Sequence, residues 1–482
     1  TRLEAVIVPP DAGEASALTV RVEPALLSAV VDSLAYIEQY PYASTDVLVG
    51  QFLSNVLTYR ALQDLEVGDV TLTAQLETSV RAGLERLYLR QNPDGGWGWW
   101  EGESTLHLTA YAVLGMTRAR QAGFAVRDAV FAQALTYVSA RLALDLQGET
   151  RSADDAFALY VLSEANARWP VGAGAALYAA REALGKMGRA YLMLALGTTD
   201  PSDSRMPALL EGLRNDARIT ATGAHWESAN NLHWNTDTVL TALVVDVLAR
   251  FAPSDPLLVQ AVRWLMVARR GGGWQTTYET AWAISGLTAA LRASGDWDAA
   301  YNWGVTLNGV PLAEGEARAR ALDMPVRLRV GLSGGDTATA DLPALLLRDR
   351  LNVLEMSRTA GTGQLYYTAH LELAPPVGAI AAESRGFTLR REYCAVTDKP
   401  ADDLAPCQPV TLLRTGELAE VRLTLIAPQT RYFVLLEDPY PAGLEPVADE
   451  SAATVAGGAV WSSAPFEHRE LRDAQAVFIA HE

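Results

Sequence analysis

The chain has 482 residues, of which 49% are hydrophobic and 20% charged, so its composition is that of a globular protein with two to four domains. A formal net charge of −18 argues against nucleic acids and anionic membranes as partners, because both are bound by clustered Lys and Arg. No apolar run reaches the roughly 18 residues that a membrane span requires.

The first element is a β segment over residues 1–22. Leu18, Val20 and Val22 alternate with Thr19 and Arg21, which is the two-residue period of a strand. After Pro24 the composition changes, and residues from about 25 to 295 are rich in Ala and Leu with apolar side chains at helical spacing. Similar Ala-rich helical segments recur every 30 to 50 residues or so, which predicts stacked helical hairpins.

Two Gly-Trp elements lie between these helices, at residues 91–100 and 271–274. Glycine permits the left-handed backbone of a tight turn. A tryptophan directly after the glycines then offers a large flat side chain that fills the gap between neighbouring hairpins. We therefore interpret both elements as structural.

The helical period ends near residue 297, and short alternating runs follow. Residues 326–330, 421–425 and 432–436 are the clearest, and turn clusters separate such runs, which predicts β-sandwich modules. The two cysteines, Cys394 and Cys407, flank a short polar segment in this region. They are compatible with one loop disulfide in an oxidising compartment or with two free thiols.

Some polar residues within the helical region are candidate sites. A loop rich in aromatic residues holds imidazole and carboxylate groups that suit zinc, but at a spacing that matches no known ligand pattern, so we predict no metal. These residues are His225, Glu227, His233 and Asp237. Asp154 and Asp155 lie at the start of a predicted helix, where acidic side chains favour the helix dipole, and His107 is interpreted as a cap or a packed histidine.

Four stretches, in chain order, resemble the alpha-2-macroglobulins of bacteria. They are residues 40–47 (YPYASTDV), 91–100 with 108–111 (QNPDGGWGWW and LTAY), 275–283 (QTTYETAWA) and 437–446 (EDPYPAGLEP). The corresponding family motifs are YPYGCTEQ, QNxDGGFGWW with LTAY, STQDTAWA, and EDPxPAGFEP. The resemblance covers nearly the whole chain.

This resemblance implies a multidomain α plus β architecture. An α/α toroid of the kind found in terpenoid cyclases, at residues 23–297, would be inserted in a β-sandwich domain of CUB type. The two halves of that domain would be residues 1–22 and 298–374. A C-terminal macroglobulin domain would occupy residues 375–482, and the family pattern predicts further strands beyond it.

The most informative departure from the family lies at Ser44 and Val47. The family's internal thioester joins a Cys thiol to a Gln side chain three residues later, at the start of a helix. Here the two positions hold an alcohol and a hydrocarbon, so we predict that the thioester is lost and that Ser44 is a helix N-cap. The neighbouring residues that correspond to the family motif are Tyr40, Pro41, Tyr42, Thr45 and Asp46.

The function implied is protease trapping without a covalent bond, by conformational change, in an extracytoplasmic protein that is periplasmic, on the cell surface or secreted. The expected partners are target proteases or envelope proteins and other domains of the same polypeptide, with no cofactor and no enzymatic activity. One alternative is a cell-envelope scaffold that binds partner proteins. A toroid enzyme such as a terpene cyclase is disfavoured, because the toroid lacks both an Asp-x-Asp-Asp centre and a Zn site built from Asp, Cys and His.

Overall fold

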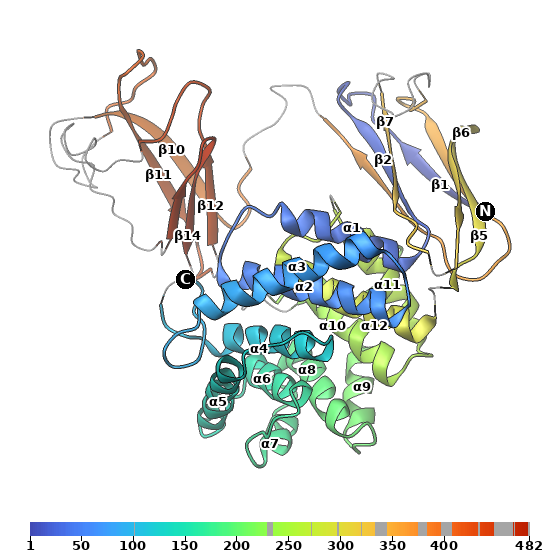
Figure 1. Ribbon diagram of the computed structural model, residues 1–482. Coiled ribbons are helices and arrows are strands. Elements are labelled where there is room, and N and C mark those ends of the chain that lie inside the picture. Colours follow the sequence, from blue (N-terminus) through green and yellow to red (C-terminus); the bar gives the residue numbers. More distant parts are fainter. Residues whose placement is uncertain are drawn as a thin grey trace. The chain divides into compact units, whose positions relative to one another are not determined.

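The computed structural model describes residues 1–100, 102–228, 235–270, 272–295, 298–319, 321–332, 345–374, 383–396, 407–431, 434–447, 466 and 468–480. The chain divides into two compact units, Thr1–Val377 and Gly378–Glu482. The first contains all the described helices and three sheets, one of them a two-stranded ribbon, and the second is built from strands (Figure 1). The predicted α plus β fold with several domains is confirmed.

Twelve helices of the first unit form a closed ring of inner and outer helices. Each inner helix packs against the next one along the chain, and the last packs against the first, so the ring closes. The inner helices are α2 (Thr45–Asp64), α4 (Leu106–Gln121), α6 (Ala153–Glu164), α8 (Gly185–Thr199), α10 (Asp237–Phe251) and α12 (Thr277–Ser294). The outer helices are α1 (Leu26–Glu38), α3 (Val70–Leu89), α5 (Asp128–Asp145), α7 (Ala173–Ala179), α9 (Met206–Asn215) and α11 (Pro256–Ala268), and a short ribbon, β3 (Arg218–Thr220) and β4 (Gly223–His225), precedes α10.

The inner helices run in the same direction, because the N-terminal ends of neighbouring inner helices are in contact and so are their C-terminal ends. His107 at the start of α4 lies 2.9 Å from Asp154 at the start of α6. At the other end, Arg292 of α12 pairs with Asp64 of α2 at 2.8 Å. Parallel helix dipoles place partial positive charge at one end of the ring and negative charge at the other. Accordingly, the first turns of α2, α6, α10 and α12 carry acidic residues, and the last turns of α4, α10 and α12 carry arginine.

Three buried tryptophans join successive hairpins in the same way. The indole N–H donates to a leucine carbonyl near the end of the preceding outer helix, and the backbone N–H donates to a threonine hydroxyl of the next inner helix. The sets are Trp97 with Leu87 and Thr109, Trp226 with Leu213 and Thr241, and Trp274 with Leu265 and Thr280. The structural role predicted for the first and third is confirmed, although Gly271 lies outside the described residues. The second was not recognised in the sequence.

An ion network lies at the C-terminal end of the inner helices and is organised by Glu164. Its carboxylate is 2.9 Å from Arg118 and 2.7 Å from Arg250, and Arg250 also pairs with Asp246. Burial alone would raise the pKa of Glu164, but the two arginines outweigh it and lower this pKa to about 2. The network thus links α4, α6 and α10 across the ring.

This network predicts a defined loss of stability in acid. A carboxyl group with a lowered folded-state pKa contributes stability above its unfolded pKa, and that contribution is lost as the pH falls towards the folded value. The difference between 4.5 and about 2 corresponds to roughly 3 kcal/mol. We expect the free energy of unfolding of wild type to exceed that of E164Q at pH 6, and the difference to shrink steadily between pH 4.5 and 2. Urea denaturation measures this, with E149Q, at an exposed position, as the control.

A β-sandwich flanks the helical ring in sequence, because its strands lie on both sides of the helices in the chain. The strands are β1 (Arg2–Ile7), β2 (Ala17–Glu23), β5 (Tyr301–Leu307), β6 (Val310–Ala317), β7 (Val326–Gly331), β8 (Leu351–Arg358) and β9 (Tyr366–Glu372). They form antiparallel sheets in the orders β1-β8-β5-β6 and β7-β2-β9. One apolar cluster, with Leu18, Val20, Trp303 and Leu354 in it, fills the space between the sheets.

A buried ion cluster joins this sandwich to the helices. Arg269, just after α11, is 4% exposed and pairs with Glu23 at the end of β2, which is fully buried. Arg269 also lies 3.3 Å from Asp32 of α1, and Asp32 pairs with Arg21 of β2 at 2.7 Å. Two cations and two anions from three elements thus neutralise one another at the junction.

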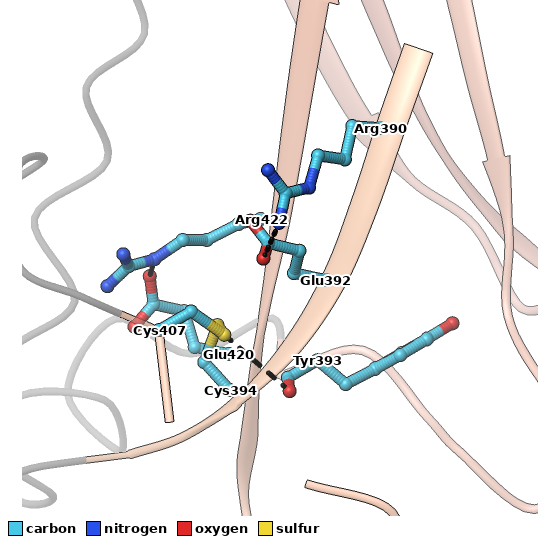
Figure 2. The surroundings of a disulfide bond; sticks show 7 residues. All are labelled: Arg390, Glu392, Tyr393, Cys394, Cys407, Glu420 and Arg422. Atoms are coloured by element: carbon cyan, nitrogen blue, oxygen red, sulfur yellow. Dashed lines mark hydrogen bonds and ion pairs between the residues drawn. A yellow bond between two sulfur atoms is a disulfide. The ribbon is translucent and has the colours of Figure 1, made fainter. Parts of the chain in front are cut away.

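The second unit contains two sheets and a disulfide. Its strands are β10 (Thr388–Ala395), β11 (Ala419–Ile426), β12 (Val434–Pro439), β13 (His468–Leu471) and β14 (Gln475–Ala480), paired as β10-β11 and β12-β14-β13. The sulfur atoms of Cys394 and Cys407 are bonded, so the bridge ties the end of β10 to the segment before β11 (Figure 2). Arg391 pairs with Asp438 at 2.5 Å and connects the two sheets. Of the helices that the structure describes, none is both long and apolar enough to cross a bilayer.

Candidate functional site

The candidate site is the turn between α1 and α2, residues 40–47. Ser44 is the N-cap residue of α2, as predicted, with an extended backbone. Its side chain does not cap the helix backbone; instead its hydroxyl donates to the carboxylate of Asp46. Ser44 and Val47 are each only 4% exposed, so the side chains of both residues are buried.

The loop that carries the first Gly-Trp element holds this turn in place. The Trp99 indole N–H donates to Asp46 at 2.9 Å, and the Trp99 carbonyl accepts from the backbone N–H of Thr45 at 2.8 Å. Burial raises the pKa of the Asp46 carboxyl, while the hydrogen bonds from Ser44 and Trp99 act in the opposite direction. The start of α2 is therefore fixed by a residue that lies 53 positions further along the chain.

Three tyrosines, all partly exposed, lie over the same turn. The rings of Tyr36 and Tyr40 are 6.1 Å apart and those of Tyr40 and Tyr42 are 5.6 Å apart, both with edge-to-face geometry. The Tyr36 hydroxyl donates to the carbonyl of Gln275 at 2.9 Å, which ties α1 to the loop before α12. Burial raises the pKa of Tyr40, so the phenol stays protonated at neutral pH.

Ser44 lies at a packed helix start, where its hydroxyl is bonded to the Asp46 carboxylate. A serine nucleophile needs a base such as histidine within hydrogen-bond reach. The nearest candidate in the sequence, His107, is buried, with Nδ1 2.9 Å from Asp154 and Nε2 3.1 Å from the Tyr278 hydroxyl. The sequence did not predict these contacts, which join α4, α6 and α12. The interpretation of His107 as a packed histidine is confirmed.

The other candidate site residues make structural contacts in the part of the chain that the structure describes. The His225 ring stacks on Trp264 at 4.9 Å, Glu227 pairs with Arg218, and Asp237 accepts from the Ser228 backbone N–H. His233 lies outside the described residues, and no group of metal-ligating side chains is found within them. Asp155 forms a capping box with Ser152 at the start of α6, as the helix-dipole interpretation predicts.

Comparison with known proteins identifies this architecture. The family described as "Bacterial Alpha-2-macroglobulin MG10 domain" matches residues 386–482. The alpha-2-macroglobulin of Thermotoga maritima is 29% identical over 120 residues, which are 25% of this chain and 7% of that protein. This chain therefore matches only a small part of that relative's length.

Two solved structures share the fold over 99% of this chain. Native alpha-2-macroglobulin of Escherichia coli, from domain MG7 to the C-terminus, superposes with a TM-score of 0.65 at 18% identity, with 72% of that chain covered. Salmonella alpha-2-macroglobulin reacted with methylamine superposes with a TM-score of 0.62 at 19% identity, with 29% of that chain covered. Residues 386–482 thus match the MG10 domain of bacterial alpha-2-macroglobulins. The helical ring and its β modules share the fold of the C-terminal region of the Escherichia coli protein.

Proposed function

We propose that this chain belongs to an alpha-2-macroglobulin that lacks the thioester and traps proteases by enclosure, without a covalent bond and without enzymatic activity of its own. The observation that carries the proposal is the pair of buried side chains at Ser44 and Val47. An acyl–sulfur bond needs a thiolate and a side-chain carbonyl, and neither is present at these positions. Enclosure would then rest on conformational change alone.

The first experiment is treatment with methylamine, the amine named for the Salmonella relative. An amine opens a thioester and releases one thiol. We expect no methylamine incorporation and no new free thiol in this protein, as measured by intact mass and a thiol reagent. The Salmonella protein is the positive control. Incorporation of methylamine as an amide anywhere in the chain, or a thiol released by the amine, would contradict the proposal.

The second experiment tests trapping with the full-length protein. After cleavage by trypsin or elastase, we expect protease activity on large protein substrates to fall while activity on small peptides persists, because an enclosed protease still admits small molecules. Denaturing electrophoresis should show no adduct between the two proteins. Unchanged activity on large substrates would exclude trapping and favour the alternative of an envelope scaffold.

Two further observations support parts of this proposal. The disulfide between Cys394 and Cys407 is typical of oxidising compartments, which favours an extracytoplasmic location. The centre of the ring is packed with aromatic side chains, including Tyr111, Phe157, Tyr191 and Trp282, whose rings lie 4.8 to 6.5 Å from neighbours in this set or from Tyr278. A toroid enzyme would hold its substrate there, so this packing disfavours that alternative.

A further inference from the structure

The outer face of the sheet β7-β2-β9 is polar and is covered by helices. Along β2, Leu18, Val20 and Val22 enter the sandwich core, while Thr19, Arg21 and Glu23 lie on the opposite face. Helices α1 and α11 pack against this sheet at β2 and β9. Thr19 is 6% exposed and Glu23 is fully buried, so polar groups on this face are removed from water.

Three polar residues form a row across this face, one from each strand. Thr19 of β2 is directly opposite Arg329 of β7 on one side and His370 of β9 on the other. Directly opposed residues in antiparallel strands share a face, with Cβ atoms about 4.5–5.5 Å apart. Both Thr19 Oγ1 and His370 Nε2 are buried, and neither has a hydrogen-bond partner among the residues that the structure describes. Buried polar atoms of this kind generally have a partner in the protein, in ordered water or in another bound molecule.

The charges around this row favour an anion. Burial lowers the pKa of His370, Arg270, Arg21 and Arg269 lower it further, and Glu372 acts in the opposite direction. Within the described part of the chain, neither Arg329 nor Arg270 takes part in an ion pair with a carboxylate.

The carboxylates nearby do not supply the missing partner. Glu23 and Asp32 are engaged by Arg269 and Arg21. Glu372, on the same strand as His370, is exposed and lies opposite Ala17 at the end of the pairing. The row therefore combines two unpartnered polar atoms with an excess of positive charge.

We propose that Arg329, Thr19 and His370, together with Arg270, bind a small oxyanion, phosphate or sulfate, between the sandwich and the helices. A tetrahedral oxyanion offers several acceptor oxygens, which would receive the Thr19 hydroxyl, a ring N–H of His370 and the guanidinium groups. The site would add a bound counter-ion to the junction that Arg269 already organises. This inference does not depend on protease trapping.

The pH dependence of binding follows from His370. Protonation gives the imidazole a donor at each nitrogen and a positive charge, so binding should tighten as the pH falls towards and below the pKa of His370. By linkage, bound phosphate should raise that pKa. The histidine signals in an NMR titration, with and without inorganic phosphate, would report this directly.

The experiment is thermal unfolding in inorganic phosphate against sodium chloride of equal ionic strength, at pH 6 and pH 8. We expect phosphate to raise the Tm of wild type by about 2 °C or more at pH 6 and by less at pH 8. R329Q and H370Q should lose most of this rise, whereas R350Q, at an exposed arginine outside the row, should keep it. An equal rise in all four proteins, or no rise in wild type, would overturn the proposal.

A separate variant, T19V, tests the unpartnered hydroxyl without changing charge. Removing a buried hydroxyl that has no protein partner should leave the Tm in chloride unchanged or slightly higher. The same substitution should weaken the phosphate-dependent rise at pH 6. A clear loss of stability in chloride would mean that Thr19 already has a partner in the protein, and the assignment would be wrong.

Discussion

Replacing Arg269 by alanine is expected to cost about 3–5 kcal/mol of stability in the unit Thr1–Val377. The substitution leaves Glu23, fully buried at the end of β2, without its principal counter-charge, and leaves Asp32 with Arg21 alone. Burial already raises the pKa of Glu23 despite the arginine beside it. Without Arg269, the pKa of the Glu23 carboxyl should rise further, or the junction should open to water.

Urea denaturation followed by tryptophan fluorescence measures this loss, because the ring contains the buried Trp97, Trp226 and Trp274. R263A, at an exposed position of the same helix α11, is the matched control and should change stability by less than about 0.5 kcal/mol. The double variant E23Q/R269A should recover part of the loss, since it removes both charges. An R269A protein as stable as R263A would show that the ion cluster does not hold the junction.

The second large effect is expected for Trp97→Ala. Trp97 is fully buried, and its truncation creates a cavity that costs about 3–5 kcal/mol. It also leaves the carbonyl of Leu87 without the indole donor. Differential scanning calorimetry should show a marked drop in Tm for the helical transition.

Trp97→Phe provides the matched comparison. The phenyl ring fills much of the space but cannot donate a hydrogen bond to Leu87. The loss of stability should therefore be clearly smaller than for alanine, and close to the cost of losing one buried hydrogen bond and leaving a small void. If the two substitutions had the same effect, the hydrogen bond and not the packing would dominate. If neither changed Tm, the proposed role of the tryptophans in joining hairpins would be wrong.

The sequence predicted the elements that have a strong local signal. The strand over Leu18–Val22, the run of stacked helices between about residues 25 and 295, and the Gly-Trp elements at residues 91–100 and 271–274 were expected from periodicity and turn residues. Trp226 was missed because it follows Ala224 and His225 instead of paired glycines. Its signal was the Thr-Ala pair at the start of α10, which resembles the pairs in α4 and α12.

The surroundings of the candidate site could be predicted only in part. The placement of Ser44 at a helix start follows from the local sequence, since a polar residue before an apolar run is typical of an N-cap. The contact of Trp99 with Asp46, and that of His107 with Asp154 and Tyr278, depend on closure of the ring. No local pattern encodes which distant side chains this closure brings together.

The insertion of the helices between β2 and β5 has a mechanical consequence. β1 pairs with β8 and β2 pairs with β9, so tension applied at the two ends of the first unit passes from strand to strand. The helices between Glu23 and Tyr301 form a loop outside that load path. When the protein is pulled at the two ends of the first unit, the helical ring should therefore bear no tension until the β-sandwich unfolds. Under tension the sandwich should unfold before the ring. During synthesis on the ribosome, by contrast, the ring emerges complete before the strands that close the sandwich have been made.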